Sequence, residues 1–220
     1  VSAHSILFMT TLTYFPIRGR AEASRLVLEH VGVQYEDKRV EFADWPELKK
    51  TLPFGQVPYY TDSDVEMPQS NAILRHLGRK HDLYGAGLKE AAQVDVLIDG
   101  VEDFFVGMLK TVDDKFHEGD RSATEAHVDK WLDIFVGMLN GNDYFVANKL
   151  SIADFCIFNV LDNFVKPLSG SQLEKREALE SFRKRVAALP NVSAYLGSDR
   201  RPAITMPPFF KVLCTPEECK

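Results

Sequence analysis

The pattern of apolar residues changes once along this chain, and the change limits the folds that it can adopt. Between residues 7 and 81, short runs typical of β-strands alternate with runs that repeat at the period of an α-helix. Beyond Gly85 and Gly87, almost every segment carries the helical period. The sequence therefore predicts an α/β domain followed by an all-helical domain, which we divide at residues 1–84 and 85–220.

The first unit has the element order β-α-β-α-β-β-α, which predicts a layered α/β fold with a mixed sheet. Its strands are expected at 7–15 and 33–42, its hairpin within 56–68, and its helices at 20–31, 44–52 and from Ser70 onward. In the second unit, helices are expected at 88–116, 122–140, 151–166, 173–188 and 190–198. The stretch after Pro202 has too many prolines for one continuous helix, so we expect a surface tail or a flap there.

Composition argues against several classes of protein. The chain has 220 residues, a net charge of −6 and three cysteines. The negative balance argues against a nucleic acid partner, and so few scattered cysteines argue against a disulfide framework. No apolar run approaches the length of a membrane span, and residues 1–15 lack the arrangement of a signal peptide. We therefore expect a cytoplasmic protein without a membrane partner.

Motifs for several common chemistries are absent from the sequence. The chain has no glycine-rich dinucleotide or P-loop motif, no H-E-x-x-H and no cysteine pair with zinc spacing. The turn after the first strand reads Tyr14-Phe15-Pro16-Ile17, where a dithiol oxidoreductase would carry C-x-x-C. The sequence thus predicts no nucleotide site, no metal site and no dithiol redox chemistry.

Gln69 and Ser70 stand at the start of the helix that closes the first unit, and they allow two interpretations. Serine is a preferred N-cap, so the pair can be purely structural. The amides and the positive end of the dipole at a helix start also attract anions, so the pair can hold a carboxylate. The residues by themselves leave both interpretations open.

Several stretches of the sequence resemble the cytosolic glutathione transferases. They are LTYFPIRGRAEASRL, DWPELKKTLPFGQVP, QSNAILRHLGRKHDLYG and SIADF. The resemblance covers residues 7–202 and combines features of the pi and sigma classes. It implies a thioredoxin-like N-terminal domain with a mixed four-stranded sheet, followed by an all-helical domain. It also implies that the thiolate of glutathione, as co-substrate and without a prosthetic cofactor, is conjugated to small hydrophobic electrophiles.

Tyr14 and Arg20 are the expected catalytic residues. A phenol at the end of a strand can donate a hydrogen bond to a bound sulfur and so favour thiolate over thiol. Lowering a thiol pKa by two units from about 8.5 corresponds to about 2.7 kcal/mol. One hydrogen bond to a charged acceptor supplies about 1.5–3 kcal/mol, so Tyr14 with a nearby cation suffices. The resemblance implies that Arg20, at the start of the first helix, lies near the sulfur.

Further residues are implied by the resemblance to bind glutathione. Trp45 and Lys49 would hold its glycine carboxylate, while Gln69 and Ser70 would hold the γ-glutamyl carboxylate, so that the cap and the anion site coincide. Val57 precedes a proline that can be cis, and its backbone would pair with the cysteinyl backbone of the tripeptide. The full set is Tyr14, Trp45, Lys49, Gln56, Val57, Pro58, Gln69, Ser70 and Asp103.

Asp103 and Phe54 carry the expectation of a homodimer. By resemblance, Asp103 reaches the γ-glutamyl amine across the subunit boundary, and Phe54 inserts into a pocket of the partner. Asp99 and Glu102 share the helical face of Asp103, and we expect them to be solvated. The resemblance leaves one alternative, since some sigma-class members bind a divalent cation with a similar acidic trio. Ser151 and Asp154 fit the pattern of a capping box, for which we expect a structural role alone.

The electrophile pocket is expected beside Tyr14, and its residues are Phe15, Ile17, Met108, Leu109 and Val112. Lys110 and Asp113 stand where sigma prostaglandin isomerases have a tryptophan and pi enzymes a tyrosine. Two alternatives to the transferase remain: a non-catalytic carrier or crystallin-like protein, and a glutathione-dependent prostaglandin isomerase. Tyr14 and the lack of a long insertion around Glu118–Thr124 favour the transferase over the non-catalytic protein.

Overall fold

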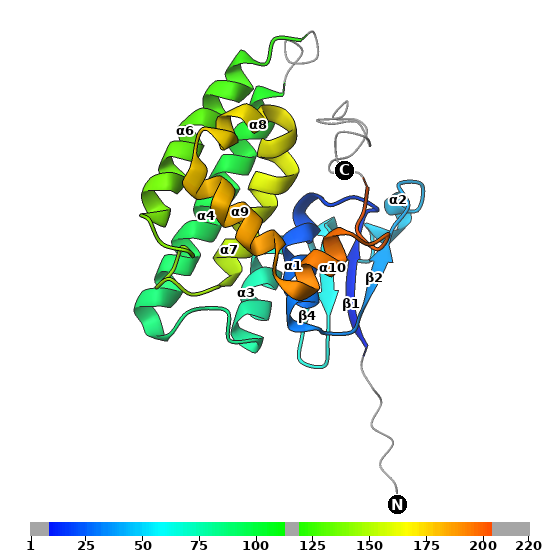
Figure 1. Ribbon diagram of the computed structural model, residues 1–220. Helices are drawn as coiled ribbons and strands as arrows, with labels where there is room; N and C mark the ends of the chain where they lie inside the picture. The colour runs from blue at the N-terminus through cyan, green and yellow to red at the C-terminus, as the bar shows by residue number, and fades with distance from the viewer. Residues whose placement is uncertain (1–8, 113–118, 204–220) are drawn as a thin grey trace, which may run out of the picture.

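The computed structural model describes residues 9–112 and 119–203, and every structural statement below concerns those residues. A mixed sheet forms the first layer of the fold (Figure 1). Its strands β1 (Thr10–Tyr14), β2 (Tyr35–Arg39), β3 (Tyr59–Thr61) and β4 (Glu66–Pro68) lie in the order β2-β1-β3-β4. The pair β1–β2 is parallel and the other two pairs are antiparallel. The expected mixed four-stranded sheet is confirmed.

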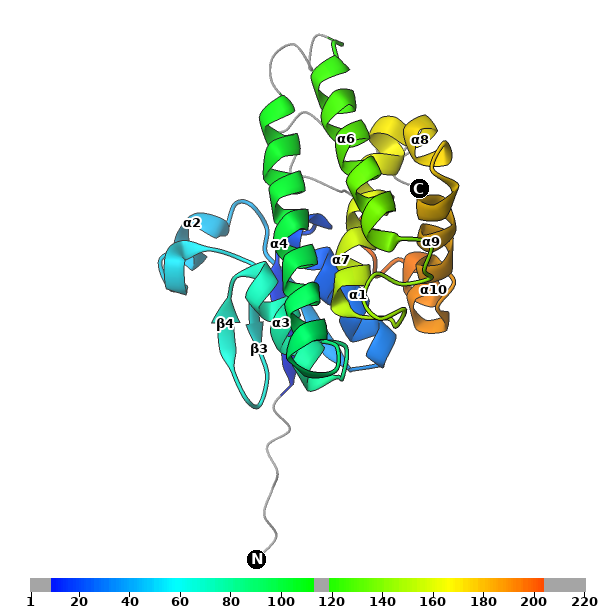
Figure 2. The same cartoon turned by 90° about the vertical axis from the view of Figure 1, so that its left-hand side faces the viewer.

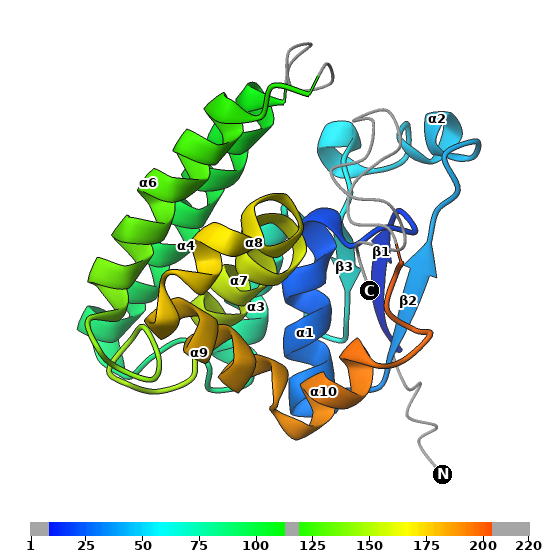
Figure 3. The same ribbon diagram turned by 45° about the horizontal axis from the view of Figure 1, so that its top comes forward.

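Helix α1 (Glu22–Val31) connects the two parts of the molecule. It follows a short turn, η1 (Gly19–Ala21), and ends at Gly32, whose φ of 73° gives the left-handed conformation common after a helix. Its apolar face buries Leu26 and Leu28 completely. Because α1 also contacts α3 (Ser70–Lys80), α7 (Ile152–Val160) and α10 (Pro190–Leu196), it lies between the sheet and the helical part (Figure 3).

The second part is helical. Two long helices, α4 (Gly87–Thr111) and α6 (Ser122–Leu139), run side by side (Figure 2). Helix α7 packs against α4 and α1 with all of its residues buried, and it continues into a π-helical segment, η3 (Leu161–Val165). The chain then forms α8 (Lys166–Glu174), α9 (Glu177–Ala187) and α10. None of the helices in the described part of the chain has the length and apolar character needed to cross a membrane.

Two expectations about helices are wrong in detail. Ser70 is not an N-cap, because α3 begins at Ser70 itself and no side chain caps its first turn. Residues 167–172 lie between two expected helices but belong to α8 in the structure, and the single helix expected at 173–188 is instead the end of α8 followed by α9. Pro167 lies in the first turn of α8, where proline is compatible with a helix. The helical backbone is kinked at Ser169, whose φ is −149°.

The connection between the two parts runs from the end of α3 at Lys80 to the start of α4 at Gly87. We propose the domain boundary between residues 84 and 85, inside this segment. The amide of Ile152, at the start of α7, donates to the Leu83 carbonyl at 2.9 Å and ties the connection to the helical part. Asp113 and the tail beyond residue 203 lie outside the described residues.

The capping box at the start of α7 is confirmed. The Ser151 amide and hydroxyl both donate to one carboxylate oxygen of Asp154, at 2.7 and 2.8 Å. The other oxygen of Asp154 accepts the Phe145 amide at 2.9 Å. These residues are buried, so the box joins the start of α7 to the loop before it and has a structural role.

Candidate functional site

A cleft of about 360 Å³ opens between the α/β part and α4. We call it the main cleft, and its residues are Phe15, Arg20, Trp45, Gly55, Gln56, Val57, Pro58, Gln69, Ser70 and Glu102. They come from the turn after β1, from α2 (Trp45–Leu48), from the turn before β3, from the start of α3 and from α4. The fold therefore brings together six of the nine residues expected to bind glutathione, with Arg20 beside them.

The start of α3 and the turn before β3 form one wall of the main cleft. The Val57–Pro58 peptide is cis. Gln69 has a φ of 77°, which is uncommon for a residue other than glycine. Its side-chain amide donates to the Gln56 side chain at 2.9 Å and so links the two segments. Ser70 follows at the first position of α3, where the amides of a helix start are available to an anion.

Tyr14 does not line the main cleft, and only 7% of the residue is exposed. Its hydroxyl oxygen accepts a hydrogen bond from the Arg20 amide at 3.2 Å. Gly19 permits this approach, because a Cβ there would lie 2.8 Å from the same oxygen. Burial raises the pKa of the Tyr14 hydroxyl, against the opposing effects of the Arg20 amide and the charges of Arg20 and Arg25. The phenol is therefore neutral near pH 7 and can donate its proton in a hydrogen bond.

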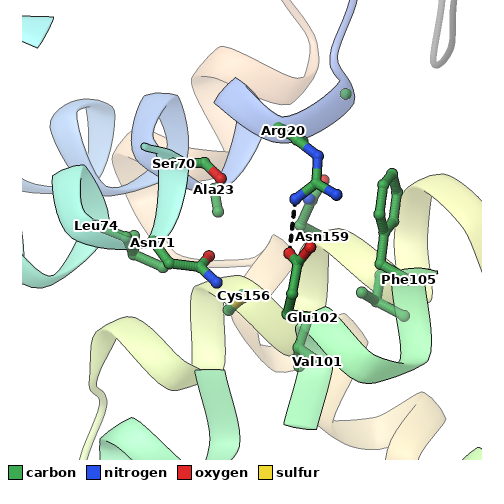
Figure 4. Close-up of a pocket in the computed structure, with 12 residues that line it drawn as sticks. Arg20, Ala23, Ser70, Asn71, Leu74, Val101, Glu102, Phe105, Cys156 and Asn159 are labelled. Carbon is green, nitrogen blue, oxygen red and sulfur yellow. Dashed lines mark hydrogen bonds and ion pairs between the residues drawn. The ribbon is translucent and has the colours of Figure 1, made fainter. Parts of the chain in front are cut away.

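Arg20 and Glu102 face each other across the cleft (Figure 4). One guanidinium nitrogen of Arg20 lies 2.6 Å from a carboxylate oxygen of Glu102, and the guanidinium carbon lies 4.7 Å from the centre of the Phe105 ring. The expectation that Glu102 is merely solvated is wrong, since it lines the cleft and pairs with Arg20. The acidic helical face was visible in the sequence, but the partner, 82 positions away, was not.

A smaller cavity of about 40 Å³ lies behind this ion pair. Arg20, Ser70 and Glu102 line it as well as the main cleft, and Asn71, Cys156 and Asn159 are among its other residues (Figure 4). Burial raises the pKa of the Cys156 thiol to about 12, so it stays protonated near neutral pH. Sequence reasoning assigned no site role to Asn71 or Asn159, because nothing in their spacing marks them.

Several expected site residues lie outside the main cleft. Lys49 is exposed just after α2, with its side chain against Gly55. Asp103 is exposed on α4. Asp99 pairs with Arg75 at 2.5 Å, so it too is not simply solvated. Among residues 9–112 and 119–203, no group of three or more His, Cys, Asp or Glu side chains is arranged to hold a metal ion.

The expected electrophile pocket is only partly supported. Ile17 and Met108 are 1% and 0% exposed, so they belong to the core and cannot line an open pocket. Leu109 and Val112 are partly buried against the same core. Phe15 does line the main cleft, where its ring lies 5.3 Å from that of Trp45 and 5.5 Å from that of Tyr14.

Comparisons with known proteins agree with this arrangement. The sequence matches the family models for the glutathione S-transferase N-terminal domain over residues 10–79 and the C-terminal domain over residues 99–199. It is 36% identical to glutathione S-transferase P 1 of Xenopus laevis, over 86% of this chain and 92% of that protein. It is 35% identical to the human hematopoietic prostaglandin D synthase, over 87% of this chain and 96% of the relative.

A solved structure leads to the same family. The glutathione S-transferase from Ascaris lumbricoides superposes with a TM-score of 0.78 at 32% identity, covering 88% of this chain and 98% of the other. Both the α/β part with the main cleft and the helical part thus have counterparts in one known architecture. The chain belongs to the glutathione S-transferase family.

Proposed function

We propose that the protein conjugates reduced glutathione to small hydrophobic electrophiles in the cytoplasm, and that Tyr14 activates the thiol. The observation that carries this proposal is the neutral Tyr14 hydroxyl, which accepts the Arg20 amide at 3.2 Å and keeps its own proton to donate. The hydroxyl lies against the amide of Arg20, and Arg20 lines the cleft together with Gln69 and Ser70. A sulfur bound there would meet a hydrogen-bond donor with the charge of Arg20 nearby.

The proposed chemistry begins with the thiol of bound glutathione. Tyr14 donates a hydrogen bond to the sulfur, which stabilises the thiolate, and the thiol proton leaves to water. The thiolate attacks an electrophilic carbon, and a carbon–sulfur bond forms. In substitution, the leaving group departs with its bonding electron pair. In conjugate addition, the resulting enolate takes a proton from water.

The walls of the main cleft support the binding of an extended tripeptide. We assign the γ-glutamyl carboxylate to Ser70 and Gln69, and the cysteinyl backbone to the main chain of Val57. Trp45 also lines the cleft, and we assign the glycine carboxylate to Trp45 and to the exposed Lys49 side chain beside Gly55. Glu102 holds Arg20 in the cleft at 2.6 Å, and we assign it a positioning role.

We further propose that the protein acts as a homodimer. Phe54 is 79% exposed on a turn where its φ is 59°, an unusual setting for so large an apolar side chain. An apolar hollow of about 250 Å³ on α4 and α6 could receive it from a second copy. The hollow is lined by Ala92, Gln93, Val96, Leu97, Met138 and Phe145. In such a dimer, the exposed Asp103 of one subunit is available to the glutathione amine in the other.

A conjugation assay tests the activity. The purified protein is incubated with reduced glutathione and a panel of an aryl halide, an enone, an epoxide and prostaglandin H2, and the products are identified by mass spectrometry. We expect thioether products with at least one of the first three. Binding of glutathione without turnover of any electrophile would instead indicate a carrier or a structural protein.

Prostaglandin isomerisation is the second candidate, because a relative at 35% identity is named as a prostaglandin D synthase. It shares the need for an activated thiolate but requires a pocket for a larger substrate. Isomerised prostaglandin in the same panel, with no thioether from the other electrophiles, would favour this second function.

A further inference from the structure

We propose that Arg25, a buried arginine that contacts the turn after β1, is a positioning residue for the conjugation reaction. In this role it fixes the turn whose amide contacts the Tyr14 hydroxyl. The inference rests on the proposed function, because it concerns how Tyr14 is prepared to meet the sulfur. Arg25 lines neither the main cleft nor the smaller cavity behind it, so it would act through Tyr14 and not on the substrate.

Arg25 joins three elements of the α/β part. Its side chain projects from α1 and is 0% exposed. Its Nε donates to Asp37 on β2 at 3.0 Å, and its Nη1 donates to the Ile17 carbonyl at 2.9 Å. The same nitrogen lies 3.3 Å from Glu22 and 3.4 Å from the Arg18 carbonyl. One guanidinium group therefore holds α1, β2 and the turn after β1 together.

The carbonyls that Arg25 holds belong to the turn that approaches Tyr14. Gly19 and Arg20 follow directly after Ile17 and Arg18, and the Arg20 amide donates to the Tyr14 hydroxyl at 3.2 Å. The backbone of Gly19 passes so close to the Tyr14 hydroxyl that an added Cβ at this position would lie 2.8 Å from the hydroxyl oxygen. A shift of the two carbonyls would carry the amide away from the hydroxyl. The contact that orients the phenol proton thus depends on Arg25.

The charge of Arg25 also acts on Tyr14 directly. Its guanidinium carbon lies 5.9 Å from the centre of the Tyr14 ring, within the range of a cation–π contact. Burial lowers the pKa of Arg25, but Glu22 and Asp37 outweigh it and raise the pKa, so the group stays charged. Glu22 is itself held by Arg201 at 2.9 Å and by the Tyr195 hydroxyl at 3.2 Å. The Arg25 guanidinium therefore remains positively charged next to the Tyr14 ring.

One donor of Arg25 is not used by the fold. Its Nη2 is buried and has no hydrogen-bond partner among the described residues. The turn that Arg25 holds and the nearby Tyr14 ring point to a role in placing Tyr14 in addition to a role in stability.

Lysine at position 25 separates these roles. It keeps the positive charge but offers a single nitrogen, which cannot bridge Asp37 and the Ile17 carbonyl as the planar guanidinium does. We would measure the thiol pKa of bound glutathione, from the pH dependence of turnover and from thiolate absorbance, in four proteins. These are the wild type, Arg25→Lys, Tyr14→Phe and the double variant.

We expect Arg25→Lys to raise the thiol pKa by up to about one unit, and turnover at neutral pH to fall by up to about tenfold. The loss should disappear at alkaline pH, and the KM for glutathione should stay within about twofold, because no binding residue is removed. In the Tyr14→Phe background, Arg25→Lys should add no further shift. That absence of an added shift is the readout that a merely structural residue would not produce.

Arg176→Lys is the matched control. Arg176 is 13% exposed and pairs with Asp129 and Asp133, far from Tyr14 in the helical part, so its variant should lose stability without moving the thiol pKa. If Arg25→Lys does not fold, Gly19→Ala disturbs the same contact and should raise the thiol pKa in the same Tyr14-dependent way. A wild type without conjugating activity would overturn the proposed function. An active wild type whose thiol pKa is unchanged by Arg25→Lys, or by Gly19→Ala where Arg25→Lys does not fold, would overturn this inference alone.

Discussion

At the scale of single residues, substitution of Tyr14 is the most direct test of the proposed chemistry. Tyr14→Phe removes the donor to the sulfur but leaves the ring in the core. One hydrogen bond to a charged acceptor contributes about 1.5–3 kcal/mol, so turnover near pH 7 should fall roughly tenfold to hundredfold. Glutathione affinity should change little, because the hydroxyl distinguishes thiolate from thiol and touches little else.

Initial rates across a pH series check this expectation, and the loss should shrink as the pH rises past the thiol pKa. Tyr59→Phe is the control, since Tyr59 lies on β3 and donates to Glu66 at 3.0 Å outside the main cleft. Wild-type turnover in Tyr14→Phe near pH 7 would show that another group activates the thiol.

The candidate site could be predicted from the sequence only as far as motifs reach. Trp45, Val57 and Ser70 belong to recognisable stretches, and the structure brings them into one cleft. No role in the cleft could be predicted for Glu102, because that role depends on its ion pair with Arg20, which is distant in the sequence. Met108 was expected to line the electrophile pocket but is buried in the core. Its apolar character alone does not distinguish a core residue from a pocket residue.

At the scale of secondary structure elements, the capping box of α7 is the clearest test of what sets the fold. Asp154→Ala leaves the Ser151 amide and hydroxyl and the Phe145 amide without their acceptor inside the protein. Each unsatisfied buried donor costs about 1–3 kcal/mol, so with three donors affected the free energy of unfolding should fall by at least that amount. Urea unfolding followed by circular dichroism measures the change.

Glu90→Ala provides the comparison. Glu90 accepts the Ala86 amide at 2.7 Å at the start of α4, but in an exposed setting where water can replace it. Its loss should lower the free energy of unfolding by only about 0.3–1 kcal/mol. Equal losses in the two variants would mean that burial of the box contributes nothing.

The order of elements was predictable, whereas their ends were not. Apolar periodicity separates strands from helices, which is why β1 to α3 appear in the expected order. The end of one helix and the start of the next depend on local backbone geometry. Ser169 interrupts α8 through a single non-helical φ, and Gln69 rather than Ser70 precedes α3 because it adopts a positive φ. These backbone angles cannot be predicted from the presence of a serine or a glutamine in the sequence.

The turn between β3 and β4 is tied to α3 by a carboxylate that should make stability depend on pH. Asp62 accepts Lys80 at 2.8 Å, His76 at 3.0 Å and the Tyr60 hydroxyl at 2.9 Å. Burial raises the pKa of Asp62, but these hydrogen bonds outweigh it and hold the pKa well below its ordinary value. The stabilisation is therefore complete above an unfolded pKa of about 3.9 and is lost as the pH falls below it.

Asp62→Asn should lower the free energy of unfolding at pH 7 by roughly 1–3 kcal/mol. The difference from the wild type should narrow as the pH falls below about 4, since Asp62 of the unfolded wild-type chain then gains a proton while the native carboxylate stays charged. Unfolding by urea at several pH values follows this. Asp64→Asn serves as control, because Asp64 also pairs with Lys80 but its side chain is 58% exposed. A difference that is constant with pH would rule out the carboxylate as its source.

At the scale of the whole molecule, the site is built by both parts of the chain. Trp45, Gln69 and Ser70 come from the α/β part, whereas Glu102 comes from α4 in the helical part. Helix α1 contacts α3 in the α/β part and α7 and α10 in the helical part (Figure 3). Arg20 lies in η1 just before α1, so its position depends on how the two parts pack. An isolated α/β part would therefore keep most of the cleft wall but lose the partner of Arg20.

The proposed homodimer depends on the exposed Phe54 side chain. Phe54 is 79% exposed and Val96, in the apolar hollow on α4 and α6, is 61% exposed. Burying an aromatic side chain of this size contributes roughly 1.5–3 kcal/mol, so each subunit that inserts Phe54 into the other adds this amount to association. Because a symmetric dimer contains the contact twice, Phe54→Ser should weaken dimerisation by roughly 3–6 kcal/mol. Sedimentation at micromolar concentration should then show a dimer for the wild type and mostly monomer for the variant.

Met9→Ser is the control for removing an exposed apolar side chain, because Met9 is 62% exposed beside the start of β1, away from the hollow. It should leave the dimer intact. The monomeric Phe54→Ser protein should also bind glutathione more weakly, because it lacks the partner's carboxylate at position 103. Addition of Asp103→Asn to the monomeric variant should then have no further effect on glutathione affinity, whereas Asp103→Asn alone should weaken it in the dimer. A wild type that sediments as a monomer and binds glutathione with full affinity would contradict both the dimer and the role of Asp103.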